Sequence, residues 1–347
     1  MIHETQPSSP SLDRRRFLAL AGAAAGWAAG VRAAAPNAAP APFSVPPRDE
    51  VELTDGRLRL AVSPSDGAGL LAFKLQRDGR WIDLYPDVRD GSLKMRYASW
   101  MMIPYSNRVE NGRFRFEGKD YELRNGQNHS IHGDARSRSW KVAEKAASRL
   151  KLTLRSADFA DFNWPWPIEV EAEIAVGDGA LTQRLRIRNA GTSPMPAGFV
   201  WHPYYPRTMT KAGEPVLMQM KFASVYPDAN GDCIPDGPPQ PLPPDLDYSA
   251  PRAVPTDRRY DTCLGGYDGK GAIEWPDSGV RLEYDCSANV THFVYYNPVE
   301  KPVFAAEPAA NANNGVNLLA RGESGHGVIV LPAGEALDAH FITRVKG

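Results

Sequence analysis

The sequence has few cysteines and almost no net charge. Its 347 residues include three cysteines, Cys233, Cys263 and Cys286, so at most one internal disulfide bond can form and one thiol must be left over. None of them stands in a Cys-x-x-Cys pair or a Cys/His cluster with zinc-like spacing, so we expect three isolated small residues and no metal. The formal net charge is −1, with lysine and arginine dispersed along the chain. This excludes the basic surface that nucleic-acid binding requires and fits a neutral small-molecule substrate.

The sequence also lacks long amphipathic helices, internal repeats and a strand-helix-strand rhythm. Instead, apolar and charged residues alternate in the segments 57–62, 151–155, 168–174 and 181–187. Alternation with period two is typical of an antiparallel sheet that has one face in water. Turn dipeptides such as Asp178-Gly179 separate these runs. We therefore expect an all-β fold, a large antiparallel β-sandwich that occupies residues 48–347 as one domain.

The first 47 residues are not expected to belong to this fold. An arginine pair stands before Phe17-Leu18 and a short Ala/Gly-rich apolar stretch, residues 19–31. This order is typical of a twin-arginine signal peptide, which we assign to residues 1–35, and residues 36–47 are expected to form a Pro/Ala-rich tether. The apolar stretch is shorter than the roughly 20 residues of a spanning helix, although a retained membrane anchor is the alternative. We expect a periplasmic protein without stable membrane insertion after the signal is removed.

One segment interrupts the strand rhythm. Residues 227–255 are rich in Pro, Gly and Asp, and proline removes the amide donors that a central strand needs. We therefore expect a long excursion over the surface, at the rim of a substrate cleft. Calcium binding by residues 228–232 is the alternative, but Gly231 comes two residues too early for an EF-hand loop and the glutamate at its twelfth position is missing.

Two side chains at the ends of apolar runs are candidates for acid-base chemistry. His202 follows Gly-Phe-Val-Trp, and an imidazole can hold or release a proton near neutral pH, so it suits a general acid. Glu307 follows the apolar run 302–306, where lost hydration would raise its pKa and suit a general base. Pro308 is expected to end that strand. The alternatives are a buried structural histidine and a salt-bridged carboxylate at the rim.

Other polar and aromatic residues could hold a sugar. Arg108 has planar donors that can hold two hydroxyl groups, and Asp261 has two acceptor oxygens for vicinal hydroxyl groups. Tyr204 and Tyr205 stand beside His202 and could stack on the apolar face of a pyranose. Stacking on a sugar is also conceivable for the tryptophans, but no such role is assigned to Trp164, Trp166 or Trp275.

A fifth polar candidate, His132, stands three residues after His129, so a metal site is an alternative there. No carboxylate or cysteine in the adjoining sequence completes such a site. His132 lies in a His-Gly-x-x-Arg segment that is followed by a tryptophan, Trp140.

Five short phrases now stand in one order along the chain: Asn-Arg-Val at Arg108, Ile-His-Gly at His132, Trp-His-Pro-Tyr-Tyr at His202, Tyr-Asp-Thr-Cys at Asp261 and Ala-Glu-Pro at Glu307. Together they resemble the aldose 1-epimerases, also called galactose mutarotases. The resemblance extends to an Ile-Pro-x-Gly phrase at 234–237 and to the closing segment 327–335, but Ala309-Ala310 replaces the Met-Thr or Gln-Thr that commonly follows the Glu-Pro element.

The resemblance implies a mutarotase-like sandwich and an isomerase that interconverts the anomers of a free aldose without a metal or other cofactor. It implies Glu307 as base and His202 as acid, with Arg108, His132 and Asp261 holding the sugar. Two other functions stay open. One is a periplasmic sugar-binding protein without turnover, and the other is a hexose-6-phosphate 1-epimerase, which would need additional basic residues at the cleft rim and a cytoplasmic supply of substrate. The preferred sugar and the oligomeric state are left open.

Overall fold

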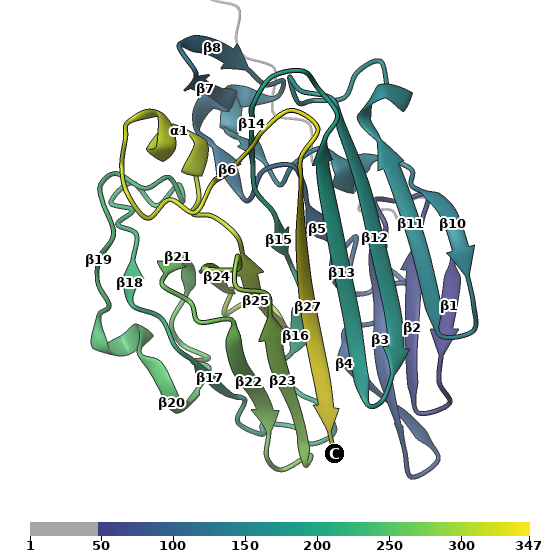
Figure 1. Ribbon diagram of the computed structural model, residues 1–347. Coiled ribbons are helices and arrows are strands. Elements are labelled where there is room, and N and C mark those ends of the chain that lie inside the picture. Colours follow the sequence, from purple (N-terminus) through teal and green to yellow (C-terminus); the bar gives the residue numbers. More distant parts are fainter. Residues whose placement is uncertain (1–47) are drawn as a thin grey trace, which may run out of the picture. The chain divides into compact units, whose positions relative to one another are not determined.

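The computed structural model describes residues 48–347, so the signal peptide and tether predicted for residues 1–47 lie outside the described residues. In the described part, nearly all regular structure is antiparallel β-strand, and the one α-helix there is short, α1 (Gly315–Ala320) (Figure 1). The prediction of an all-β fold is confirmed. No helix among these residues has the length and apolar character needed to cross a membrane.

The largest sheet contains nine strands, and its long strands β13, β27 and β23 run side by side (Figure 1). In sheet order the strands are β10 (Lys141–Lys145), β11 (Arg149–Arg155), β12 (Ile168–Gly177), β13 (Ala180–Asn189), β27 (Ala336–Lys346), β23 (Val280–Cys286), β22 (Lys270–Trp275), β17 (Leu217–Met220) and β20 (Tyr248–Ala253).

The second large sheet contains eight shorter strands. Its order is β19 (Gln240–Pro241), β18 (Ser224–Val225), β21 (Tyr260–Gly265), β24 (His292–Asn297), β25 (Val303–Ala309), β15 (Val200–Trp201) and β5 (Met101–Met102), and β16 (Tyr204–Pro206) also pairs with β25.

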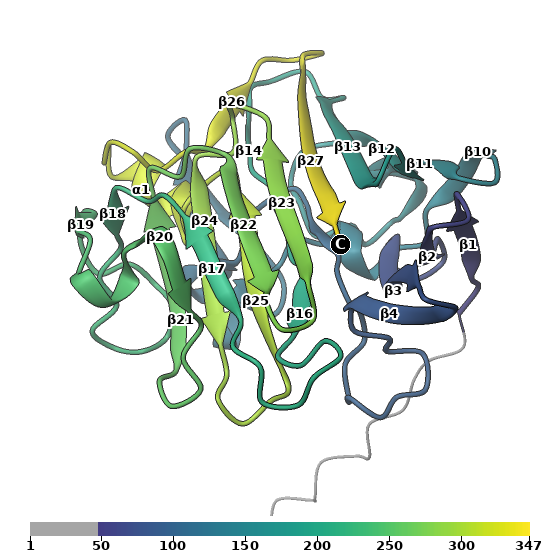
Figure 2. The same ribbon diagram turned by 90° about the horizontal axis from the view of Figure 1, so that it is seen from below.

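A four-stranded sheet and three strand pairs complete the β-structure of residues 48–347. The sheet consists of β1 (Val51–Thr54), β2 (Leu58–Ser63), β3 (Gly69–Arg77) and β4 (Arg80–Tyr85), and β1 and β2 contact β12. Figure 2 shows these four strands beside the part of the large sheet that carries β11 and β12. The pairs are β6 (Arg108–Val109) with β9 (Ser130–Ile131), β7 (Arg113–Phe116) with β8 (Lys119–Glu122), and β14 (Met195–Ala197) with β26 (Ile329–Leu331). The short 3₁₀ helices are η1 (Glu110–Gly112), η2 (Gly126–Asn128), η3 (Ala135–Ser137), η4 (Ser156–Asp158) and η5 (Pro244–Leu246).

The alternation in the sequence produces the two faces of the nine-stranded sheet. Along β12, buried residues such as Ile168 and Val170 alternate with more exposed ones such as Glu169. The β12–β13 hairpin turns at Asp178-Gly179, where both residues have positive φ, 51° and 69°. Two positive φ values in a row are what a tight hairpin turn needs, and Asp-Gly supplies them at low cost.

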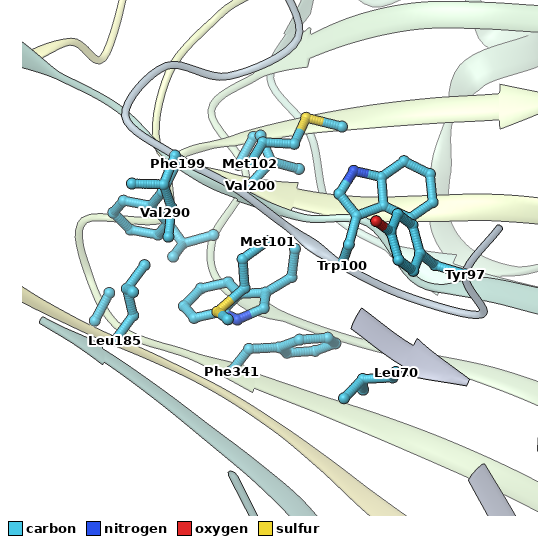
Figure 3. Packing of buried hydrophobic residues seen from close by; sticks show 14 of the residues in the cluster. Leu70, Tyr97, Trp100, Met101, Met102, Leu185, Phe199, Val200, Val290 and Phe341 are labelled. Carbon is cyan, nitrogen blue, oxygen red and sulfur yellow. The ribbon is translucent and has the colours of Figure 1, made fainter. Parts of the chain in front are cut away.

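Aromatic side chains fill the space between the two large sheets. The rings of Trp201 on β15 and Phe341 on β27 lie 5.8 Å apart, and the ring of Phe341 is 4.8 Å from that of Tyr284 on β23. Figure 3 shows the neighbouring part of this core, where residues of β5 and β15 pack towards those of β13 and β27; labelled there are Met101, Met102, Phe199, Val200, Leu185 and Phe341. This packing fixes the position of β15, and His202 directly follows it.

The prediction for residues 227–255 is only partly right. The segment is not a surface excursion throughout, because residues 248–253 form β20, which pairs with β17. Pro251 is accommodated because β20 is the last strand of its sheet and needs amide donors on one side only. Whether a strand lies at an edge is decided by the whole fold and is not visible in its own residues.

Candidate active site

The candidate site lies where one strand of the eight-stranded sheet is interrupted. β25 pairs along one side with β24. On its other side it meets β15 near its end and β16 near its beginning, and between these two short strands the chain leaves the ladder at His202 and Pro203. Glu307 lies on β25 opposite this interruption. The break therefore allows the side chains of His202 and Glu307 to meet.

The interruption also explains an error in the prediction for Pro308. This residue does not end the strand, because β25 continues to Ala309 and Pro308 stays in register with Phe293 on β24. A proline is tolerated in a sheet where its missing amide hydrogen is not needed by a neighbour. The neighbour of β25 is interrupted at this level.

His202 and Glu307 form a buried contact. Nε2 of His202 lies 3.2 Å from Oε1 of Glu307, and the two residues are 4% and 1% exposed. The remaining polar atoms, Nδ1 of His202 and Oε2 of Glu307, are buried and have no hydrogen-bond partner. Buried polar atoms are rarely left unpaired, and a group of them at one place indicates a site for a polar ligand.

Burial changes the proton affinities of both residues. It lowers the pKa of His202 to about 3 and raises the pKa of Glu307 well above its usual value. Asp261 raises the pKa of Glu307 further, whereas the positive charge of Arg108 lowers it. The environment thus favours the uncharged form of each group, and the contact is best described as a pair that shares one proton and titrates as a unit.

Trp100 holds the imidazole of His202 in place. The two rings are stacked with their centroids 3.8 Å apart, and the backbone amide of His202 donates to the carbonyl of Trp100 at 2.9 Å. The indole also lies 5.8 Å from the ring of His132. An aromatic face of this kind interacts favourably with an imidazolium as well as with a neutral imidazole.

His132 and Arg108 enter the site from the β6–β9 pair. Arg108 pairs with Ile131 across this short ladder, and the amide of His132 donates to the carbonyl of Asn107 at 2.6 Å. The ring of His132 stands nearly perpendicular to that of His202, with centroids 5.6 Å apart. Burial and the nearby positive charges, Arg136 foremost, lower the pKa of His132 well below its usual value. Its Nδ1 atom is buried without a partner.

Asp261 lies on β21, which is separated from β25 by β24 alone. Burial raises its pKa, and Arg108 is close enough to oppose this shift. A cavity of about 280 Å³ adjoins Asp261 and is also lined by Asp228, Cys233 and Asn313. The carboxylate of Asp261 therefore lies beside an open cavity and is also close enough to Glu307 to raise its pKa.

Five predicted polar residues are thus brought together from five separate parts of the chain: Arg108, His132, His202, Asp261 and Glu307. A family model described as aldose 1-epimerase matches residues 49–344, almost the whole described part. The chain belongs to the aldose 1-epimerase family.

Several proteins resemble the chain over most of its length. The uncharacterized protein YphB of Escherichia coli K12 is 24% identical over 309 residues, which is 85% of this chain and 98% of YphB. A galactose mutarotase-like protein from Clostridium acetobutylicum has a TM-score of 0.71 and 14% identity, over 86% of this chain and 96% of its own. A GalM/aldose epimerase homologue from C. elegans has a TM-score of 0.70 and 16% identity, over 86% and 99%. These structures show that the fold is that of the family.

Within this aldose epimerase fold, the two adjacent tyrosines take different places. Tyr204 is partly exposed, and its ring lies 4.8 Å from that of His202. Tyr205 is 0% exposed, and its hydroxyl is hydrogen-bonded to that of Tyr284 in the core. Successive residues of a strand point to opposite faces. The prediction that Tyr205 contacts the substrate is therefore wrong, and Tyr204 remains a candidate.

The unassigned tryptophans do not approach the His202–Glu307 pair through any ring contact in residues 48–347. Trp164 and Trp166 stack with Phe114, and their own rings lie tilted to each other, 5.6 Å apart. Trp275 is 0% exposed in the core.

Two residues near the catalytic candidates were missed by the sequence reasoning. Trp100 stacks on His202 although the two residues are far apart in the sequence; β5 and β15 bring them together by pairing Met101 with Trp201. Arg136 lowers the pKa of both His132 and His202. Its position in the His-Gly-x-x-Arg segment was the available signal, and no signal in the sequence indicated Trp100.

Side chains from both alternative metal sites form hydrogen bonds with the backbone instead. Nδ1 of His129 accepts the amide of Asn111 at 3.1 Å, and the carboxylate of Asp228 accepts the amides of Asp232 and Cys233 at 3.1 and 2.8 Å. No group of three or more His, Cys, Asp or Glu side chains suited to a metal is found within residues 48–347. All three cysteines are buried and free.

Proposed function

We propose that the protein is an aldose 1-epimerase, an isomerase that interconverts the α and β anomers of a free aldose. The observation that carries this proposal is the buried contact between Nε2 of His202 and Oε1 of Glu307, in which each residue keeps one further polar atom without a partner. Anomer exchange needs a base and an acid that work together on neighbouring oxygen atoms. A proton-sharing pair beside unpaired polar atoms meets that need.

The reaction opens the sugar ring and closes it again. Glu307 takes the proton of the C1 hydroxyl group while His202 gives a proton to the ring oxygen, the bond between C1 and the ring oxygen breaks, and the free aldehyde forms. After rotation about the C1–C2 bond, the ring oxygen attacks the other face of C1. His202 then recovers its proton and Glu307 returns the other, so the enzyme ends in its initial state.

The shifted pKa values suit this exchange. In the free enzyme both groups prefer to be uncharged, so the shared proton rests on the carboxyl group of Glu307. Arg108 favours the ionised carboxylate, and a bound C1 hydroxyl group that donates to it acts in the same direction. Binding therefore moves the proton towards His202 and prepares the acid and the base together.

The sugar is held by residues that surround this pair. We propose that Arg108 donates hydrogen bonds near the ring oxygen and that His132 donates or accepts one there. We also propose that Asp261 accepts from hydroxyl groups and that Tyr204 packs against the ring. Acid-base assistance of this kind is worth typically ~10²–10⁴-fold for each group. The reaction moves protons and breaks one C–O bond that re-forms, so it has no net redox change.

Polarimetry of freshly dissolved α-D-glucose and α-D-galactose tests the proposal. The mature protein is expected to increase the rate of mutarotation of at least one aldose in proportion to its concentration, relative to the spontaneous rate in the same buffer. Binding of a sugar, measured by calorimetry, without any rate increase would instead indicate a sugar-binding protein.

We also propose that the protein is exported to the periplasm through the twin-arginine route. The support is the order of residues in the first 35 positions. Cell fractionation of the full chain tests this, with Arg15→Lys and Arg16→Lys combined as the variant that should stay in the cytoplasm. Periplasmic delivery that is unaffected by this double substitution would contradict the proposed route.

A further inference from the structure

The strand that carries Glu307 faces a proline at the preceding residue, Ala306. β15 and β16 pair with β25 in one continuous register, and this register places Pro203 opposite Ala306. The amides of His202 and Tyr204 donate to carbonyl groups on the far side, just before β5, so the residue between them is the one whose backbone faces β25. That residue is Pro203, and proline has no amide hydrogen.

The backbone groups of Ala306 point towards this gap. The amide of Ala310, which directly follows β25, donates to the carbonyl group of Phe199 at 2.9 Å. Phe199 directly precedes β15. Backbone groups along a strand point alternately to its two neighbours, so those of Ala306, four residues before Ala310, point to the same side. The opposite strand therefore gives the carbonyl group of Ala306 no donor, directly beside the proposed base Glu307.

The hydroxyl group of Tyr284 supplies a donor from the core. Tyr284 lies on β23 of the nine-stranded sheet, and its buried hydroxyl group donates to the carbonyl group of Ala306 at 3.2 Å. Burial raises the pKa of Tyr284 well above its usual value, and Glu307 is among the nearby groups that raise it further. The hydroxyl group therefore stays protonated and remains a donor at neutral pH.

Two neighbours hold Tyr284 in this position. A phenol has one hydrogen, which Tyr284 gives to Ala306, so in the contact between the hydroxyl groups of Tyr205 and Tyr284 the donor is Tyr205. The ring of Tyr284 also packs edge to face against that of Phe341, with centroids 4.8 Å apart. A buried chain of hydrogen bonds in which each hydroxyl group donates to the next acceptor makes its surroundings rigid.

We propose that Tyr284 is a positioning residue that fixes the backbone of β25, so that the carboxyl group of Glu307 stays in reach of His202 and of the C1 hydroxyl group. This inference rests on the proposed function, because it takes Glu307 as the base. Without the phenol, the carbonyl group of Ala306 would be buried and unpaired, and the strand would move to find another donor. A displacement of about 1 Å near a reacting group can cost on the order of 10²-fold in rate.

Polarimetric measurement of kcat and KM for Tyr284→Phe, with α-D-glucose and α-D-galactose, tests the inference. Phenylalanine keeps the ring and its packing and removes only the hydroxyl group. We expect kcat to fall by about 10- to 100-fold and KM to stay within about twofold, because a misplaced base acts on the transition state and not on sugar binding. A purely structural tyrosine would lower the urea midpoint and leave kcat of the folded protein unchanged.

Tyr85→Phe is the matched control. Tyr85 is also buried in the core, and its hydroxyl group contacts that of Thr343 on β27 at the same distance, 3.2 Å. This variant should lower the urea midpoint by a similar amount and keep kcat within about twofold of the wild type. Sucrose, which favours the folded state, is present in every assay. A Tyr284→Phe variant with the wild-type kcat, or with no greater loss than Tyr85→Phe, would overturn the inference.

NMR of the histidine rings distinguishes failure of the inference from failure of the proposed function, because it needs no turnover. The ring signals of His202 are assigned by their loss in His202→Asn. If the wild type does not speed mutarotation but Tyr284→Phe shifts these signals and Tyr85→Phe does not, the function is wrong and the positioning role stands. If the wild type speeds mutarotation and Tyr284→Phe changes neither kcat nor these signals, the function stands and the positioning role is wrong.

Discussion

Nε2 of His202 lies 3.2 Å from Oε1 of Glu307, in a place where both residues are almost completely buried. Burial alone disfavours the charged form of each group, whereas their proximity favours an ion pair. The two effects oppose each other, so a small change such as sugar binding can move the shared proton. This is the physical basis of the proposed acid-base exchange.

The first prediction concerns the pH dependence of turnover. The active pair holds one shared proton, and it gains a second only when His202, whose pKa is lowered to about 3, is protonated beside a protonated Glu307. We therefore expect kcat/KM to stay constant from neutral pH down to roughly pH 4 and to fall on the alkaline side, where the pair loses its proton. Polarimetry corrected for the spontaneous rate measures this profile. An acid limb centred near 6.5, the usual pKa of histidine, would contradict the account.

The second prediction concerns stability. The folded protein raises the pKa of Glu307, so between its usual pKa and the raised one the folded state binds more protons than the unfolded state. The contribution of Glu307 to stability should therefore fall as pH rises through this interval, and be fully present below it. Glu307→Gln resembles the protonated carboxyl group and should remove this loss, making the variant more stable than the wild type by about 1–3 kcal/mol on the alkaline side.

Urea unfolding at several pH values between 4 and 9 measures this difference. Glu335→Gln, a substitution of an exposed carboxylate, is the control and should change the free energy of unfolding by less than about 0.5 kcal/mol at every pH. A Glu307→Gln variant with the same pH dependence as the wild type would show that Glu307 is not desolvated.

The third prediction concerns the turn that carries His132. Gly133 has a φ of 63°, and a Cβ atom there would lie 2.1 Å from the carbonyl oxygen of Ile103, which is backbone and cannot move aside easily. Gly118 also has a positive φ, 76°, but open space around it. Gly118→Ala should cost about 1–2 kcal/mol from backbone conformation alone, and Gly133→Ala clearly more. Equal losses for the two substitutions in thermal or urea unfolding would contradict the close approach.

The fourth prediction separates the two adjacent tyrosines. Tyr205→Phe removes a hydroxyl group bonded to Tyr284 in the core, so it should lower stability by about 1 kcal/mol and change KM little. Tyr204→Ala removes a partly exposed ring beside His202, so it should raise KM for the sugar more than it lowers the free energy of unfolding. If Tyr205→Phe instead raised KM while Tyr204→Ala mainly lowered stability, Tyr205 would belong to the site and this account would be wrong.

Much of the fold could be predicted because its signal is local. The alternation in β12 and β13 and the Asp-Gly turn between them predict a hairpin within about twenty consecutive residues. β20 was missed because Pro251 excludes a central strand but not an edge strand, and the sequence does not show which strand will be at an edge.

The site could be predicted only where a short phrase marked a residue. His202 and Glu307 meet because β15 and β16 leave a gap beside β25, which is a property of long-range pairing. Trp100 was missed for the same reason, since it reaches His202 only through the pairing of β5 with β15. Tyr205 was misplaced because proximity in sequence was used where strand alternation decides which face a side chain occupies.

The central claim is that His202 and Glu307 act as one acid-base unit. The most direct measurement is kcat/KM for mutarotation by the wild type, His202→Asn, Glu307→Gln and the double variant, each confirmed as folded by circular dichroism. Each single substitution should lower kcat/KM by ~10²–10⁴-fold, and the double variant should lose little more, because residues that act as a unit are not additive. Single variants that retain nearly the wild-type rate, or losses that multiply in the double variant, would contradict the account.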